Sequence, residues 1–177
     1  TSFAGLKMIS SVLSPVVVAP PQLISLIKLA CERWLAHPYD IVRSAIPPKV
    51  SSVDKHLPNE QISPAPRVRT AQEISYIHIQ PSENAISKIA EFAKAKLKLG
   101  SVLLIVPEER ELRRLSDLLG DAAIFLSASL SRTDRYRNYL EAVGGFKKLV
   151  IGTRSAIFAS PTDLSTLIVF REISESL

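Results

Sequence analysis

Residues 73–177 alternate between short apolar runs and longer stretches in which apolar residues recur every three or four positions. The short runs predict strands, and the periodic stretches between them predict amphipathic helices. The run 102–106 is apolar throughout, which is typical of a strand covered on both faces. Alternating strands and helices predict an α/β fold with a parallel sheet and helices on both faces. The predicted strands are 74–79, 102–106, 122–126, 148–151 and 167–170.

Capping signals mark the ends of the helices predicted between these strands. Ser82 is expected to cap the first helix, and Gly100 to end it. Gly120 is expected to end the second helix, and Ser131 with Asp134 resembles a capping box at the start of the third. These signals predict three helices between the strands.

The N-terminal part has a different pattern. An edge strand is predicted over 6–13, followed by an amphipathic helix that starts at Pro21, since proline fits the first helical turn. Its apolar positions, including Cys31 and Trp34, are expected on one packed side, with charged residues opposite. Pro38 is expected to end this helix, because the residue before proline avoids the helical backbone conformation.

A composition shift divides the chain. Asp40 is expected to cap a short helix over 41–45, after which prolines become frequent and apolar periodicity stops. Residues 51–72 are therefore interpreted as a proline-rich, semi-rigid linker. It would separate an N-terminal segment, 1–50, from the α/β domain, 73–177.

Composition narrows the function classes. The chain is 46% hydrophobic and 22% charged, as in ordinary folded proteins, and its net charge of +5 favours anionic partners. The basic excess lies in residues 1–70, which have eight basic and four acidic residues. The single cysteine, Cys31, excludes an intramolecular disulfide and a cysteine-rich zinc site. No apolar run approaches the roughly 18 residues of a membrane span, so a cytoplasmic protein is expected.

One stretch combines a buried strand with donor side chains. The run 148–151 ends in Gly152, Thr153, Arg154 and Ser155, so a guanidinium and two hydroxyls follow a sharp turn. Such donors suit a nucleic-acid backbone, because they hold phosphates without reading bases. Taken alone, the pattern also fits a strand-to-turn corner with a solvated arginine.

The whole string from Val150 to Ala159, followed by a loop and another apolar strand, closely resembles the first motor lobe of the primosomal replication-restart helicases, the PriA or primosomal protein N′ family. The resemblance implies that Gly152–Ser155 contacts single-stranded DNA. Pro107 and Glu108 match the family's Pro-Glu motif, which lines the same DNA path. Residues 29–48 are similar, more loosely, to the segment that closes the family's N-terminal DNA-binding domain.

The resemblance therefore implies a Rossmann-like (RecA-like) helicase lobe 1 preceded by a small α+β DNA-binding segment. It further implies that the chain is a fragment, with a second lobe and zinc-binding cysteines beyond residue 177. The family's acidic Asp-Glu-Glu-His box aligns with four residues that do not match it, namely Phe170, Arg171, Glu172 and Ile173.

The turn that binds nucleotide in the family also departs from the pattern. Against Gly-Ser-Gly-Lys-Thr the chain has Pro81 to Ala85, in which only Ser82 is kept as a cofactor-binding position. Pro81 lacks an N–H, Glu83 adds negative charge, Asn84 replaces the lysine, and Ala85 lacks the magnesium-binding hydroxyl. We therefore expect no ATP hydrolysis, as in degenerate actinobacterial members of the family.

No catalytic or metal-binding constellation is found in the sequence. The histidines, His37, His56 and His78, are far apart, and no metalloprotease motif is present. The basic residues near the predicted DNA path either extend it or are ordinary solvated charges, and the second is preferred. They are Arg132, Arg135, Lys147 and Lys148.

The expected function is a replication-restart protein that binds stalled or branched fork DNA, single-stranded regions included, and helps reload the replisome. Its expected partners are DNA and other primosome proteins, with no membrane, and its expected processes include DNA repair and recombination. Two alternatives stay open. One is a divergent but active ATP-dependent 3′–5′ helicase, and the other is a protein-interaction module.

Overall fold

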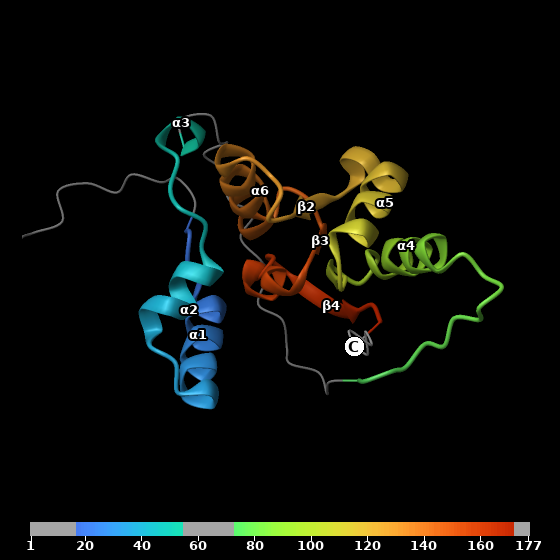
Figure 1. Ribbon diagram of the computed structural model, residues 1–177, viewed down its shortest axis with the longest axis horizontal. Coiled ribbons are helices and arrows are strands. Elements are labelled where there is room, and N and C mark those ends of the chain that lie inside the picture. Colours follow the sequence, from blue (N-terminus) through green and yellow to red (C-terminus); the bar gives the residue numbers. More distant parts are fainter. Residues whose placement is uncertain (1–16, 55–72, 172–177) are drawn as a thin grey trace, which may run out of the picture.

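The computed structural model describes residues 17–54 and 73–171, and shows a sheet between two helical layers (Figure 1). The predicted strand 6–13 and most of the predicted linker lie outside the described residues. The helices are α1 (Pro21–Trp34), α2 (Pro38–Ala45), α3 (Ser51–Asp54), α4 (Ala85–Lys96), α5 (Glu109–Leu119), η1 (Gly120–Ala122), α6 (Arg132–Gly144) and η2 (Arg154–Ala159). The strands are β1 (Ser101–Ile105), β2 (Ile124–Leu126), β3 (Leu149–Gly152) and β4 (Leu164–Val169).

The four strands form one parallel sheet in the order β2-β3-β1-β4. The central strands pair with Val102 opposite Leu149 and Ile105 opposite Gly152. Four of the five strands predicted over residues 73–177 are therefore confirmed, with shifts of up to three residues at their ends. The α/β fold class with a Rossmann-like parallel sheet is confirmed as well.

The predicted strand 74–79 is wrong. Residues 73–80 form no strand in the structure, and Ile74 and Tyr76 are 72% and 86% exposed. The segment runs outside the sheet before it enters α4 (Figure 1). Its alternation of apolar residues favours extended backbone, but a strand also needs a neighbour to satisfy its N–H and C=O groups. Within the described ranges, β4 remains an edge strand.

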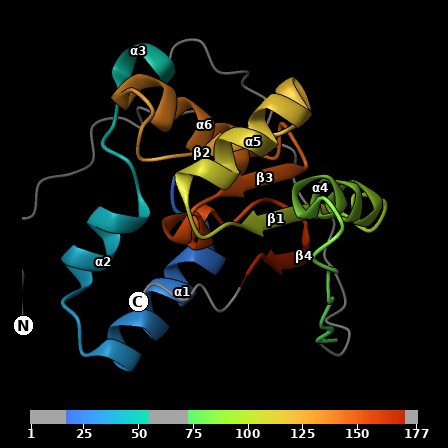
Figure 2. The same cartoon turned by 45° about the vertical axis from the view of Figure 1, so that its right-hand side comes forward.

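Helices cover both faces of the sheet, as the alternation predicts (Figure 2). Side chains alternate across the strands, so Leu103 and Ile105 pack on one face while Val102 and Leu104 pack on the other. The first face contacts α6, η2 and the N-terminal helices. The second face contacts α4 and α5. The N-terminal helices therefore share a hydrophobic core with the sheet.

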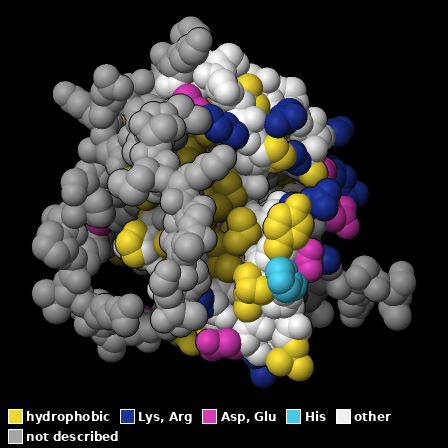
Figure 3. Space-filling model, turned by 90° about the vertical axis from the view of Figure 1, so that its left-hand side faces the viewer, with side chains coloured by type: hydrophobic (Ala, Val, Ile, Leu, Met, Phe, Trp, Pro, Cys, Tyr) yellow, Lys and Arg dark blue, Asp and Glu magenta, His cyan; other side chains and the backbone are white. Residues whose placement is uncertain are grey.

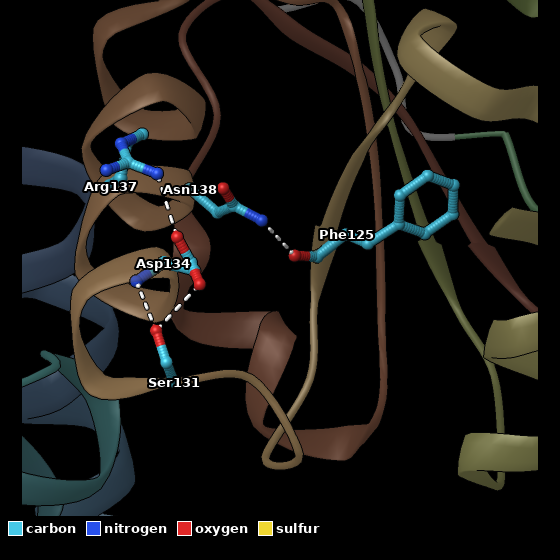
Figure 4. Close-up of polar contacts among 5 residues, drawn as sticks. All are labelled: Phe125, Ser131, Asp134, Arg137 and Asn138. Carbon is cyan, nitrogen blue, oxygen red and sulfur yellow. Dashed lines mark hydrogen bonds and ion pairs between the residues drawn. The ribbon is translucent and has the colours of Figure 1, made fainter.

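The N-cap predicted at Ser131 of α6 is confirmed, but the reciprocal bond of a capping box differs, because the Asp134 carboxylate accepts the Ser131 hydroxyl and not the Ser131 N–H (Figure 4). Ser131 Oγ accepts the N–H of Asp134 at 3.1 Å and donates to its carboxylate at 2.7 Å. Arg137 pairs with the same carboxylate at 2.8 Å. One turn further along, the Asn138 side chain donates to the Phe125 carbonyl at 2.8 Å. That bond attaches α6 to the outer strand β2, which lies next to β3.

The helix α1 starts at Pro21 as predicted, and Leu23, Ile27 and Ala30 lie in the core. The packed position predicted for Trp34 is wrong, because its side chain is 70% exposed. The last turn of α1 lies away from the sheet (Figure 1). Other apolar side chains of α1 and α2, and of the residue directly after α1, are also exposed, and they are Ile24, Leu29, Leu35, Tyr39 and Val42. Figure 3 shows hydrophobic side chains at the surface on the side of the molecule where α1 and α2 lie.

The short second helix starts earlier than predicted. It begins at Pro38, and His37 Nδ1 accepts the Tyr39 N–H at 3.2 Å, so His37 and not Asp40 is the cap. Proline at the first helical position needs no hydrogen-bond partner, which allows the helix to begin immediately after His37. None of the helices in the described ranges is long and apolar enough to cross a membrane.

The first four residues of the predicted linker form the helical turn α3, which packs against α6. Asp54 is buried there and accepts a hydrogen bond from the Tyr136 hydroxyl at 3.0 Å. The ammonium of Lys49 lies 3.2 Å from the same carboxylate. The division into domains at residues 51–72 stays a prediction, since residues 55–72 lie outside the described part.

Candidate nucleic-acid interface

The predicted DNA-binding corner begins where β3 ends at Gly152. This residue is buried, and its carbonyl accepts the Val106 N–H at 2.9 Å. A Cβ at this position would lie 2.4 Å from the Ala156 Cβ and 2.8 Å from the Leu126 carbonyl oxygen. Glycine is therefore required by close packing of the β2 end and η2 around the turn, and not by an unusual backbone angle.

The donors of this corner face outward at the start of η2. Thr153 lies just before η2, and its carbonyl accepts the Ala156 N–H at 2.8 Å. Arg154 and Ser155 are exposed, whereas Thr153 is half-buried. Within residues 17–54 and 73–171, Arg154 has no hydrogen-bond or ion-pair partner. Its guanidinium is therefore available to an anion from solution.

Pro107 and Glu108 lie at the same edge of the sheet. They follow β1, which pairs with β3 so that Ile105 is opposite Gly152. Glu108 is exposed and precedes α5 without capping it through its side chain. The structure thus brings the two predicted DNA-contacting motifs together at adjacent strand ends, where ligands bind in open α/β sheets. The contacts with DNA themselves stay predictions.

Glu109 connects two loops at this edge, which the sequence did not reveal. Its carboxylate accepts hydrogen bonds from Ser127 Oγ at 2.7 and 2.8 Å and from the Ala128 N–H at 3.2 Å. The Ser129 hydroxyl lies 3.5 Å away. Because Glu109 follows β1 and Ser127 follows β2, these bonds join the loops on both sides of the β3 end. No local pattern distinguishes such a glutamate from an ordinary helix-start charge.

The turn aligned with the family's nucleotide loop leads into α4, whose first amides are capped by a side chain of the turn. Asn84, and not Ser82 as predicted, caps α4: its Oδ1 accepts the N–H groups of Ile86 and Ser87 at 3.1 and 3.2 Å. Asn84 directly precedes the first helical residue, so its short side chain reaches these donors and Ser82 does not. Two amides of the first turn of α4, directly after the aligned loop, are thus bonded within the chain.

The Glu83 carboxylate lies at the same turn, before the start of α4. Glu83 accepts the Gln80 N–H at 3.3 Å and pairs with the Lys88 ammonium at 3.1 Å. The hydrogen bond from Lys88, followed by the one from Gln80, holds the pKa of this carboxyl below its ordinary value. Glu83 is therefore negatively charged at neutral pH, beside the helix start where a triphosphate would place its own charge. The residues of this turn do not fit a nucleotide phosphate.

The first two positions aligned with the family's acidic box are occupied by Phe170, a buried aromatic residue, and Arg171, a cation. Phe170 is buried, and the Arg171 guanidinium lies 5.1 Å from its ring centre. Arg171 also lies 3.4 Å from the carboxylate of Glu111, which is 2% exposed and has Arg110 at 3.5 Å. Glu172 and Ile173 lie outside the described residues. In the part of the chain that the structure describes, no group of His, Cys, Asp or Glu could hold a metal ion.

Comparison with known proteins supports the resemblance found in the motifs. The chain is 28% identical over 198 residues to proteins of Mycobacterium tuberculosis and Mycobacterium bovis named "Probable replication restart protein PriA". It is 26% identical over 204 residues to the protein of the same name in Mycobacterium leprae. These alignments cover 97–99% of the chain but only 30–31% of each relative. No protein-family model matches the chain.

The predicted resemblance to PriA is thus confirmed along nearly the whole chain, and not only at the strongest motifs. The chain spans about 30% of the length of these curated relatives.

Proposed function

We propose that this chain acts in replication restart by holding the phosphate backbone of fork DNA at the carboxyl edge of its sheet. The similarity to proteins named as replication restart proteins supports the process. The observation that supports the contact is the exposed guanidinium of Arg154, which has no partner in the described part of the chain and lies between two hydroxyl residues. On this proposal, stalled or branched forks are the substrate, and other primosome proteins are the partners.

The corner at Gly152–Ser155 is suited to binding the phosphate backbone of DNA and not to recognising a base sequence. Arg154, Thr153 and Ser155 present charged and neutral donors, which match phosphate oxygens. They follow a glycine turn whose packing keeps them at a fixed position relative to β1 and β3. Glu108 at the neighbouring strand end is an acceptor, so it would face base amino groups or sugar hydroxyls and not phosphates.

We further propose that the turn over residues 80–85 binds no nucleotide, so that the chain contributes no ATPase activity. Three features support this: the Asn84 side chain on the first amides of α4, the negative charge of Glu83, and Phe170 with Arg171 in place of an acidic metal-binding pair. Phosphoryl transfer depends on neutralising phosphate charge with cations and magnesium, and this turn does the opposite.

The DNA contact is tested by measuring fork-DNA affinity for the wild type and Arg154→Ala over a range of salt concentrations. Loss of one charge-assisted phosphate contact should weaken binding about tenfold and reduce the slope of log affinity against log salt by about 0.7–0.9. Arg113→Ala is the matched control, because Arg113 is exposed on α5, on the other face of the sheet. Salt-insensitive binding that is unchanged in Arg154→Ala would contradict the proposal.

The nucleotide proposal is tested by calorimetry with ATP and magnesium and by phosphate release with and without fork DNA. We expect neither saturable heat nor DNA-stimulated release from this chain. Saturable binding that Asn84→Ala or Glu83→Gln strengthens would show that the turn still accepts a triphosphate. DNA-stimulated release would instead support a divergent active helicase.

A further inference from the structure

A small cavity lies beside the candidate DNA-binding corner, where α2, α6, η2 and the end of β2 meet. Its volume is about 130 Å³. Its polar lining comes from four separate parts of the chain, namely Arg43 and Ser44 of α2, Ser127 after β2, Arg135 of α6 and Ser155 of η2. Ser155 belongs to both the cavity and the predicted DNA corner, so the two are continuous.

The charged side chains in the described lining of the cavity are basic. Among the described residues that line it, two are arginines and none is acidic. Neither Arg43 nor Arg135 forms an ion pair with a described carboxylate. On the other side of Ser127 lies the half-buried Glu109, whose carboxylate already accepts the Ser127 hydroxyl and the Ala128 N–H. The lining therefore favours an anion.

One donor in this lining lacks an acceptor. The Nε of Arg135 is buried and has no hydrogen-bond partner. Buried polar atoms are almost always hydrogen-bonded, and an unpaired donor on a charged group is especially unfavourable. The Arg135 guanidinium as a whole has no hydrogen-bond or ion-pair partner among the described residues, so an oxyanion in the cavity that Arg135 lines would lie beside an uncompensated cation. Because guanidinium groups bind phosphate oxygens with several donors at once, two arginines at one cavity suit a phosphate group.

The size of the cavity limits what it can hold. Sites for drug-sized ligands have volumes of about 300–1,000 Å³, well above the 130 Å³ found here. The cavity has room for one phosphate group and not for a whole nucleotide. The rest of the ligand must then lie outside, along the surface that Ser155 shares with Arg154.

We propose that this cavity binds one phosphate of the single DNA strand that crosses the Gly152–Ser155 corner, with Arg135 and Arg43 as its ligands. This rests on the proposed DNA-binding function and adds a second, deeper backbone contact to it. The strand would be held at Arg154 on the surface and at Arg135 in the cavity.

The test is single-strand and fork-DNA binding by the full chain across a salt series, for the wild type, Arg135→Gln, Arg43→Gln and the control Arg113→Gln. We expect Arg135→Gln and Arg43→Gln each to weaken binding about tenfold and to reduce the single-strand salt slope by about 0.7. Arg113→Gln should match the wild type. Circular dichroism confirms folding of each variant, and the exposed Arg43 provides the readout if Arg135→Gln fails to fold.

The outcomes separate this inference from the proposed function. If Arg154→Ala weakens binding while Arg43→Gln and any folded Arg135 variant keep the wild-type affinity and slope, the cavity holds no phosphate and the surface contact stands. If the wild type shows no salt-dependent DNA binding, both proposals are overturned. Arg135→Lys keeps the charge but loses the planar donor group. Compared with Arg135→Gln, it should regain the wild-type salt slope of DNA binding but only part of the wild-type DNA affinity.

Discussion

Replacing Gly152 with alanine tests whether close packing defines the candidate DNA-binding corner. The added Cβ would lie 2.4 Å from the Ala156 Cβ and 2.8 Å from the Leu126 carbonyl oxygen. Neither neighbour is the end of a flexible side chain, so the backbone of η2 or β2 must move. Overpacking a well-packed site costs about 1–3 kcal/mol, and we expect Gly152→Ala near the upper limit, at about 3 kcal/mol.

For a chain of 177 residues, a loss of about 3 kcal/mol corresponds to a fall in melting temperature of about 6–12 °C. Urea unfolding followed by circular dichroism measures the free energy of unfolding directly. The same variant should bind DNA more weakly, because a shift of η2 displaces Thr153 and Arg154.

The double variant Gly152→Ala/Ala156→Gly is the sharper measurement. It removes the 2.4 Å contact but leaves the 2.8 Å contact with the Leu126 carbonyl. The two changes should therefore be coupled, with the double variant more stable by about 1 kcal/mol or more than the sum of the single effects predicts. A Gly152→Ala protein within about 0.5 kcal/mol of the wild type, the size of an ordinary surface substitution, would refute the packing explanation.

Three further predictions concern the helix starts and the buried carboxylate. Asn84→Ala removes the cap of α4 and should cost about 1 kcal/mol in urea unfolding, whereas an unchanged stability would mean that the amides find other acceptors. The hydrogen bond from Lys88 lowers the pKa of Glu83, so the stabilisation is present above the ordinary glutamate pKa and is lost as pH falls through the lowered one. In an NMR titration, Lys88→Met should raise the Glu83 pKa towards its ordinary value, and no change would contradict the assignment. Tyr136→Phe removes the 3.0 Å donor to buried Asp54 and should destabilise the fold by about 1–3 kcal/mol, while a smaller loss in denaturation experiments would mean that water replaces the hydroxyl.

The parts of the fold that were predicted correctly depend on local or strongly periodic signals. The continuous apolar run at 102–106 is specific to a strand covered on both faces, and Ser131 with Asp134 is a short-range capping pattern. The prediction of a strand at 74–79 was wrong because strand formation depends on a neighbouring chain segment. The local alternation of apolar and polar residues does not encode that neighbour.

The capping error at α4 has a related cause. Ser82 and Asn84 are two residues apart and have similar preferences for the cap position, so propensity alone does not decide between them. The structure decides, because only Asn84 reaches the amides of Ile86 and Ser87.

The candidate site was predicted in part. The corner at Gly152–Ser155 is continuous in sequence and therefore visible, and its position at the edge of the sheet follows from strand polarity. The cavity beside it was missed, because Arg43 and Arg135 come from distant segments that meet only in the folded chain. Arg135 was interpreted as a solvated charge, and nothing in its neighbourhood along the sequence indicates that its Nε is buried.

The position of η2 has a mechanical consequence. This short helix contacts α1, α2 and α6 as well as β1 and β3, and the Tyr139 hydroxyl of α6 donates to the Val18 carbonyl just before α1 at 2.8 Å. A pulling force on a DNA strand bound at Arg154, as proposed above, would therefore be transmitted to both the sheet and the N-terminal helices. On the proposed function, a shift of those helices would in turn move η2 and change its contact with the DNA, so the N-terminal helices and the DNA contact would be linked through one short helix.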